Sequence, residues 1–221
     1  MSRTHFIPWL AVLAGAAILP AQTAGTLQAL GSATLSVRPD QAQLTVSVSS
    51  EAATAQQAAQ QNSTNTNALL DALNQVLGAN GFIQTIAYSV YPRYSTGSNS
   101  SIIGYTATNT VQITMYDLNL PGKLIDAAAQ SGASSIGTLS FGLRDPDPSK
   151  QQALTAAGKQ ALAHAAAIAA GLGAKAGPVI SAQESASSSY AISGVASSTS
   201  TPVVTGYVTV TANVTITVQL Q

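Results

Sequence analysis

The sequence predicts an α+β protein in which mainly antiparallel sheets carry helices packed on one face, arranged as two small α/β sandwich subdomains. Two patterns lead to this prediction: segments in which apolar and polar residues alternate, and alanine-rich segments with larger apolar residues at helical spacing. The clearest alternation covers residues 208–220, where valine, isoleucine and leucine alternate with threonine. We expect a strand there with one buried face and one wet face.

Earlier in the chain, alternation on both sides of Pro39 and Asp40 predicts two short strands around a turn within residues 33–48. Residues 51–78 are rich in alanine and glutamine, and their second half carries leucine and valine at helical spacing. We expect a helix with one apolar face that closes at Gly78.

A hairpin and then a mixture of helices and strands are expected in the middle of the chain. Serine, glycine and asparagine connect two alternating segments, which predicts two strands joined by a turn-rich loop. Prolines precede and glycines follow a long alanine-rich segment, as at the two ends of a helix. The predicted strands are residues 82–94, 102–115, 136–143 and 178–184, and the predicted helices are residues 121–130 and 149–172.

The long C-terminal strand needs partners of comparable length, and residues 42–50 and 102–115 are the best candidates. We therefore expect it to return to the first sheet, which makes the first subdomain discontinuous. A serine- and alanine-rich stretch with few bulky apolar residues predicts a mobile loop before that strand. The predicted division is a signal peptide at 1–24, a first α+β subdomain at 25–117 plus 202–221, an inserted second α+β subdomain at 118–184, and the mobile loop at 185–201.

The N-terminus has the order of a secretory signal peptide. Arg3 and His5 precede an apolar run at residues 7–19, and small and polar residues follow, with Ala21 and Ala24 as possible last residues of the signal. The run is shorter than the roughly 20 residues of a membrane-spanning helix. We expect a periplasmic or secreted protein without stable membrane insertion after signal removal.

Composition narrows the class of partner. The formal net charge is 0 and the chain contains no cysteine. Scattered basic residues do not form the stripe that binds phosphates, so no nucleic acid partner is expected. Without disulfides, stability depends on apolar burial, and a core made largely of alanine favours a homo-oligomer. The basic residues after the signal are Arg38, Arg93, Lys123, Arg144, Lys150, Lys159 and Lys175.

Few residues suggest catalysis or the binding of a metal or cofactor. His164 is the one histidine after the signal peptide, and it lies among alanines of the predicted long helix, where a structural role is favoured over a catalytic one. No serine lies in a nucleophile-elbow pattern. We therefore predict no catalytic, cofactor-binding or metal-binding residues, no cofactor, and a protein that is not an enzyme.

Two weaker motifs favour structural interpretations. Asp145 and Asp147 resemble a pair of cation ligands, but no complete ligand loop accompanies them, and negative charge at the start of a helix explains them better. Gly171, Gly173 and Gly177 resemble a nucleotide-binding loop, yet such a loop follows a strand and opens a helix. Here the order is reversed, so these glycines are expected to end the helix and lead into a strand.

Three tyrosines recur every third residue at Tyr88, Tyr91 and Tyr94, with Pro92 between them. Because proline suits an edge strand, we expect them on both sides of a sheet edge or at a subunit interface, in preference to a ligand-binding strip. Arg38, beside Pro39-Asp40, is expected to form either a turn-fixing ion pair or a contact between subunits.

Five blocks of sequence occur in a specific order: GSATLSVRPDQAQLTVSVSS, GYTATNTVQITMYDL, AAAQSGASSIGTLSFGLRDP, VISAQE and TPVVTGYVTVTANVTITVQL. Together they resemble the SIMPL-domain family of bacterial envelope proteins, which includes YggE-like proteins and a periplasmic immunogen of brucellae. The resemblance runs from about Gly31 to the end of the chain. One departure is at Ala133-Ser134-Ser135, where many relatives carry an asparagine after Gly-Ala.

The resemblance implies a periplasmic or secreted α+β protein, a tendency of some members to form ring-like or hollow assemblies, and an association with oxidative or envelope stress. It implies no catalytic residues. Two functions follow as alternatives. The preferred one is a non-enzymatic, self-assembling envelope protein, and the other is a monomeric periplasmic binding or scavenging module for a small or damaged molecule. The small-molecule or cell-wall ligand is not identified by the residues.

Overall fold

The computed structural model describes residues 25–96, 101–189 and 201–221, so the predicted signal peptide lies outside the described residues. The chain forms seven strands and three helices within these ranges. The strands are β1 (Thr26–Val37), β2 (Gln41–Ala52), β3 (Gly81–Tyr94), β4 (Ile102–Met115), β5 (Ser135–Gly142), β6 (Ala176–Ser189) and β7 (Val208–Leu220). The helices are α1 (Ala55–Leu77), α2 (Pro121–Gln130) and α3 (Asp147–Gly171).

The larger of two antiparallel sheets has the strand order β3-β4-β2-β5, and α1 and α2 pack on one of its faces. Thr54 caps α1 by accepting a hydrogen bond from the Gln57 amide at 3.2 Å. The helix buries Leu69, Leu73 and Leu77, which recur at intervals of four residues. These leucines meet the buried side of β2 and β4 in the main hydrophobic core.

The smaller sheet has the order β1-β7-β6 and is covered by α3. The buried residues of α3 are alanines at every fourth position, namely Ala153, Ala157, Ala161, Ala165 and Ala169. Because alanine is small, the helix backbone lies very close to β1. A Cβ atom added at Gly31 would lie only 2.0 Å from the Ala157 carbonyl oxygen, so this contact requires glycine.

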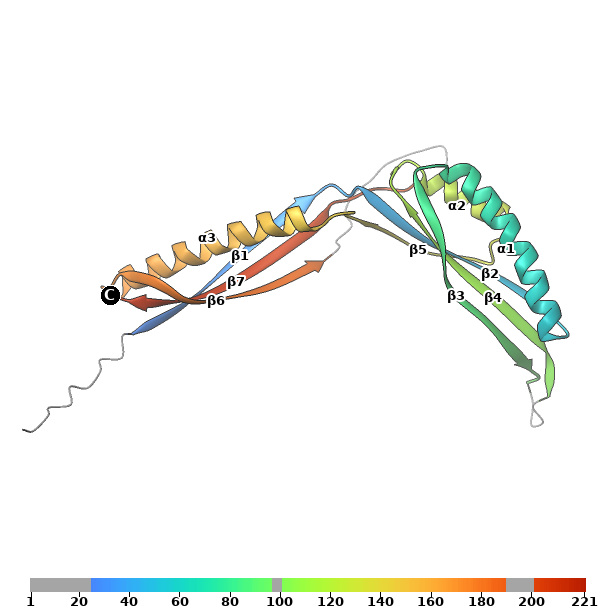
Figure 1. The fold of residues 1–221 in the computed structure, drawn as a ribbon, viewed down its shortest axis with the longest axis horizontal. Helices are drawn as coiled ribbons and strands as arrows, with labels where there is room; N and C mark the ends of the chain where they lie inside the picture. Colours follow the sequence, from blue (N-terminus) through green and yellow to red (C-terminus); the bar gives the residue numbers. More distant parts are fainter. Residues whose placement is uncertain (1–24, 97–100, 190–200) are drawn as a thin grey trace, which may run out of the picture.

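The two sheets form two lobes placed end to end in an elongated, bent molecule (Figure 1). The link from β1 to β2 and the link from β5 to α3 meet at the junction. There the Asp40 carboxylate accepts a hydrogen bond from the Arg144 amide at 2.7 Å. The Arg144 guanidinium lies 4.0 Å from the centroid of the Tyr116 ring, so a cation–π contact holds the same junction.

The predicted pairing of the C-terminal strand was wrong. β7 pairs with β1 along twelve residues and with β6 on its other side, whereas β2 and β4 pair with each other in the larger sheet. Alternation in β7 shows which face is buried, but every strand of suitable length offers the same backbone hydrogen bonds. β1 was expected to be short, since Gly31 and its neighbouring alanines obscure its first half.

The predicted grouping of the middle of the chain is also corrected by these pairings. Residues 118–184 do not share one sheet: α2 and β5 join the larger sheet, while α3 and β6 join the smaller one. The helix-and-strand alternation was correct, but the chain crosses between lobes after β5. The predicted serine-rich loop begins too early as well, because residues 185–189 belong to β6. The part at 190–200 lies outside the described residues.

Most individual elements are confirmed within a few residues, as is the α+β class with helices on one face of antiparallel sheets. The expected hairpin is formed by β3 and β4. The uncovered face of the larger sheet is polar along β2 and β4, where hydroxyl groups bond across the two strands. Ser47 lies 2.9 Å from Thr110, and Ser49 lies 2.8 Å from Thr108, measured between side-chain oxygens.

Candidate functional site

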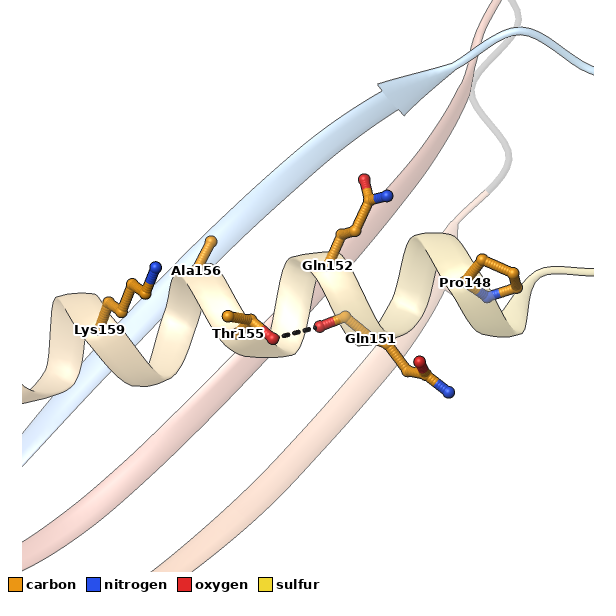
Figure 2. A pocket seen from close by; sticks show the side chains of 6 residues that line it. All are labelled: Pro148, Gln151, Gln152, Thr155, Ala156 and Lys159. Atoms are coloured by element: carbon orange, nitrogen blue, oxygen red, sulfur yellow. Dashed lines mark hydrogen bonds between the residues drawn. The ribbon is translucent and has the colours of Figure 1, made fainter.

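A broad hollow of about 530 Å³ lies over α3, lined by Pro148, Gln151, Gln152, Thr155, Ala156 and Lys159. All six residues come from one helix, and Figure 2 shows their side chains pointing in different directions. The dashed contact in that view is internal to the helix, from the Thr155 hydroxyl to the Gln151 carbonyl at 2.8 Å. This surface does not converge on a ligand, so we do not assign it a site.

A smaller pocket of about 290 Å³ lies between α1 and the β3–β4 hairpin, and it brings together polar groups from three elements. Its lining is Asn62, Ser63, Thr66, Asn67 and Leu70 from α1, Tyr88 from β3, and Asn109 from β4. We call it the Asn109 pocket. None of these described lining residues carries a formal charge at neutral pH.

The inner wall of the Asn109 pocket is formed by two buried polar residues of α1. Asn62 is fully buried, and its amide nitrogen donates to the Val48 carbonyl at 2.8 Å and to the Ala107 carbonyl at 3.0 Å. Thr66 is 4% exposed, and its hydroxyl donates to Asn62 Oδ1 across a long 3.5 Å contact. Asn62 therefore joins α1 to β2 and β4 with both of its N–H groups.

The opposite wall carries an unsatisfied group. Asn109 Oδ1 is buried and has no hydrogen-bond partner within the described part of the chain. Most buried side-chain polar atoms are hydrogen-bonded, so this acceptor is available to a donor from outside the protein once the Asn109 side chain turns toward the pocket. Tyr88 lies opposite Asn109 in the strand register and is 52% exposed, so its ring is available beside the same pocket.

Sequence reasoning missed Asn62, Thr66 and Asn109, although each interrupts an apolar pattern. Asn62 and Thr66 share the helix stripe that continues with the buried Leu69 and Leu73. Asn109 has the same strand parity as Val111, which faces the core. The signal in the sequence was a polar residue at a position where the pattern predicts a buried side chain.

His164 has the structural role that the sequence favoured. Its Nδ1 donates to the Leu30 carbonyl at 2.7 Å, and one turn earlier Gln160 Oε1 accepts from the Ser32 amide at 2.6 Å. Both backbone groups lie on β1, an edge strand of the smaller sheet. The two side chains therefore satisfy part of the strand edge that no other strand covers.

The acidic pair and the glycines also have the expected places. α3 begins at Asp147, and the Asp145 carboxylate accepts a hydrogen bond from the Asp147 amide at 3.1 Å. α3 ends at Gly171, and Gly173 turns the chain at a positive φ of 73° before β6. In the described ranges, no group of three or more histidine, cysteine, aspartate or glutamate residues is placed to hold a metal ion.

The three tyrosines lie on β3, an edge strand, as Pro92 led us to expect. Tyr88 pairs with Asn109 and shares the helix-covered face, whereas Tyr91 pairs with Thr106 on the uncovered face. The prediction that they occupy both sides of a sheet edge is confirmed. Their predicted role at a subunit interface stays a prediction.

Arg38 does not form the predicted turn-fixing ion pair. Among the described residues the ion pair found joins Arg93 to Glu51, and Asp40 instead accepts from the Arg144 amide. Asp40 precedes β2 and Arg144 follows β5, so this bond extends the β2–β5 pairing and joins two chain links. The alternative role of Arg38 as a contact between subunits stays a prediction.

Comparison with known proteins identifies the family. Residues 27–218 match the SIMPL family model, described as a protein of unknown function (DUF541). The chain belongs to the SIMPL family. The uncharacterized protein YggE of Escherichia coli K12 is 32% identical over 162 residues, which are 72% of this chain and 65% of the relative. YggE of Shigella flexneri matches to the same extent, and YggE of Edwardsiella ictaluri is 30% identical over 95 residues, 43% of this chain and 40% of the relative.

This SIMPL chain thus matches somewhat less than two thirds of the length of the first of these relatives. Neither the family description nor the names of the relatives states a catalytic activity. In the part of the chain that the structure describes, no helix combines the length and apolarity needed to cross a membrane.

Ser134 occupies the place where a family asparagine was expected. Its hydroxyl accepts a hydrogen bond from the Ser49 amide at 2.9 Å and lies 3.4 Å from the Ser49 carbonyl oxygen. The Ser134 amide donates to the Ser47 carbonyl at 2.9 Å. In this SIMPL chain the residue therefore continues the pairing of β2 just before β5 begins.

Proposed function

We propose that this SIMPL chain is a non-enzymatic, secreted or periplasmic protein that self-assembles. The observation that supports the proposal is an exposed apolar surface at the outer end of the smaller lobe. It includes the second half of α3 and the start of β6, and we call it the end surface. The predicted link to envelope or oxidative stress stays a prediction.

The α3 part of the end surface has no formal charge at neutral pH with His164 neutral. Residues 161–172 consist of alanine, leucine, isoleucine and glycine apart from His164. The helix buries one alanine per turn, which leaves large side chains outside: Leu162 is 51%, Ile168 43% and Leu172 66% exposed. Leu162 and Ile168 flank the buried alanine stripe on opposite sides, and several large exposed apolar side chains on one uncharged segment favour an interaction site.

The β6 part adds a strand edge. Val179 is 47% and Ile180 58% exposed, and they follow α3 by only a few residues. Within the described residues β6 pairs with β7 alone, so its outer backbone groups are open to another strand. The β1 edge is different, because Gln160 and His164 occupy part of it.

A second copy of the chain is the partner that fits the end surface. An apolar surface is complementary to itself, although the exposed Lys175 between α3 and β6 adds one positive charge beside it, and an open antiparallel edge can pair with its own symmetry mate. The alanine core of the smaller lobe buries little apolar area per residue, so covering Leu162, Ile168 and Leu172 would add stability.

The test is the solution mass of the processed chain, measured by light scattering after size exclusion at several concentrations and salt levels. We expect a stable multiple of the chain mass, and we expect the double variant Leu162→Glu with Ile168→Glu to fall to the monomer mass because it buries two charges. Gln151→Glu, on the polar half of the same helix, is the matched control and should keep the multiple. A monomer for the unaltered chain at every concentration would contradict the proposal.

A second function, a periplasmic binding or scavenging module, is favoured by one observation. The Asn109 pocket contains a buried acceptor without a partner in the described chain and is lined by three structural elements. The binding module is expected to be a monomer, so a monomer mass in the light-scattering experiment would favour it over self-assembly.

A further inference from the structure

We propose that the Asn109 pocket binds one unit of a neutral sugar. The inference rests on the second candidate function, the binding module, and assigns the chemical class of its ligand. It is independent of assembly through the end surface.

The absence of formal charge in the described lining requires a neutral ligand. A carboxylate, phosphate or ammonium group entering the pocket would lose water without gaining an opposite charge. The lining instead offers amide and hydroxyl groups on Ser63, Asn67 and Asn109, with Asn62 and Thr66 buried behind them. Ligands that match such a lining carry several hydroxyl or amide groups.

The hydrogen bonds already made inside the protein show whether a ligand would donate or accept in this pocket. Both N–H groups of Asn62 are already used by the Val48 and Ala107 carbonyls. Asn109 Oδ1 still needs a donor, and Asn62 Oδ1 has only the long bond from Thr66. A ligand that reaches Asn109 Oδ1, after the Asn109 side chain turns toward the pocket, must present an O–H or N–H to it.

The remaining lining is apolar on one side, which suits a sugar ring because such a ring has an apolar C–H face as well as hydroxyl groups. The Tyr88 ring is 52% exposed and Leu70 lies in the same lining. The C–H face of a pyranose packs on such a surface while its hydroxyl groups reach the amides opposite. An aromatic side chain supplies both apolar area and a polar end for this contact.

The volume is compatible with one ring. The pocket measures about 290 Å³, just below the roughly 300–1,000 Å³ range of ligand sites.

The experiment measures binding of glucose, galactose and N-acetylglucosamine to the processed chain, using saturation-transfer NMR and then calorimetry. We expect at least one of these sugars to bind with a millimolar or lower Kd. Asn109→Leu should raise the Kd about tenfold, because one hydrogen bond to the sugar is lost. Tyr88→Ala should raise it by a similar factor by removing the ring surface.

Tyr91→Ala is the matched control, since Tyr91 lies on the same strand but on the opposite face, at 67% exposure. It should leave the Kd unchanged. Glucuronate and glucosamine, the charged counterparts, should bind more weakly than the neutral sugars. Melting temperatures near that of the unaltered chain would show that Tyr88→Ala and Tyr91→Ala remain folded.

Sugar binding that is indifferent to Tyr88→Ala would place the ligand elsewhere and overturn the inference. Binding of neutral dipeptides at Tyr88 and Asn109, without binding of any sugar, would overturn the ligand class and keep the binding module. If neither sugars nor dipeptides bind, both the ligand class and the second candidate function are overturned, while the assembly proposal is untouched.

Discussion

Gly31 shows how much one residue contributes to the smaller lobe. It lies on β1 beneath α3, where an added Cβ would lie 2.0 Å from the Ala157 carbonyl oxygen and 2.4 Å from the Ala161 nitrogen. Both atoms belong to the helix backbone, so no side-chain rotation relieves the overlap. The close packing therefore depends on the absence of a side chain on the strand and on alanine on the helix.

We predict opposite effects for two glycine-to-alanine substitutions in this lobe. Gly31→Ala should lower the free energy of unfolding by about 1–3 kcal/mol, because α3 must move away from β1. Gly158→Ala should raise it by about 0.5–1 kcal/mol, because nothing lies within 4 Å of the added Cβ and alanine favours a helix. Urea unfolding of the two variants measures both changes, and equal effects of the two would contradict the packing described.

At the scale of a whole element, α3 packs its alanine stripe on the smaller sheet and bonds to β1 through Gln160 and His164 on one flank of that stripe. The exposed Ile168 continues this flank, and the exposed Leu162 lies on the other flank. Helical geometry produces this division, because residues four apart lie on one side of the helix. Gln160 and His164 are separated by four residues and so reach neighbouring backbone groups of the same strand.

We predict that the edge contacts of α3 protect β1. Gln160→Ala should speed hydrogen exchange at the Ser32 amide, because its acceptor is lost. His164→Ala should lower the free energy of unfolding by about 0.5–1.5 kcal/mol, the usual net value of one hydrogen bond. Lys159→Ala changes the same helix without touching the strand and serves as the control. Unchanged exchange at Ser32 in the Gln160 variant would show that the bond does not protect the edge.

The whole molecule has separate hydrophobic cores in its two lobes. The main core lies between α1, α2 and the larger sheet, and two smaller clusters lie between α3 and the smaller sheet. β7 is the central strand of the smaller sheet, so it supplies the pairing surface for both β1 and β6. Val203, just before β7, packs instead against the main core.

We predict that deleting residues 207–221 removes one lobe and preserves the other. Hydrogen-exchange protection should be lost in β1 and β6, which have no other strand partner in the described chain, and retained in β2 and β4. The physical reason is that the buried face and the backbone partners of the smaller sheet both depend on β7. Loss of protection in β2 and β4 as well would show that the lobes fold as one cooperative unit.

The class, the helices and most strands of this protein could be predicted from the residues alone, because hydrophobic periodicity is a local property. The alternation in β7 and the leucines of α1 indicate both the type of element and its buried face. Local chemistry also placed Asp147 at the start of α3 and Gly173 at the turn after it. The family blocks were recognisable because each consists of consecutive residues and so is also a local property of the sequence.

Only the tertiary structure decided which strands are neighbours and which polar residues meet. β7 would alternate in the same way beside β2 or β4, and backbone hydrogen bonding does not distinguish these partners. The Asn109 pocket joins Asn62, Tyr88 and Asn109 from three elements. Their proximity follows from the packing of α1 on the β3–β4 hairpin, and no local pattern in the sequence carries that information.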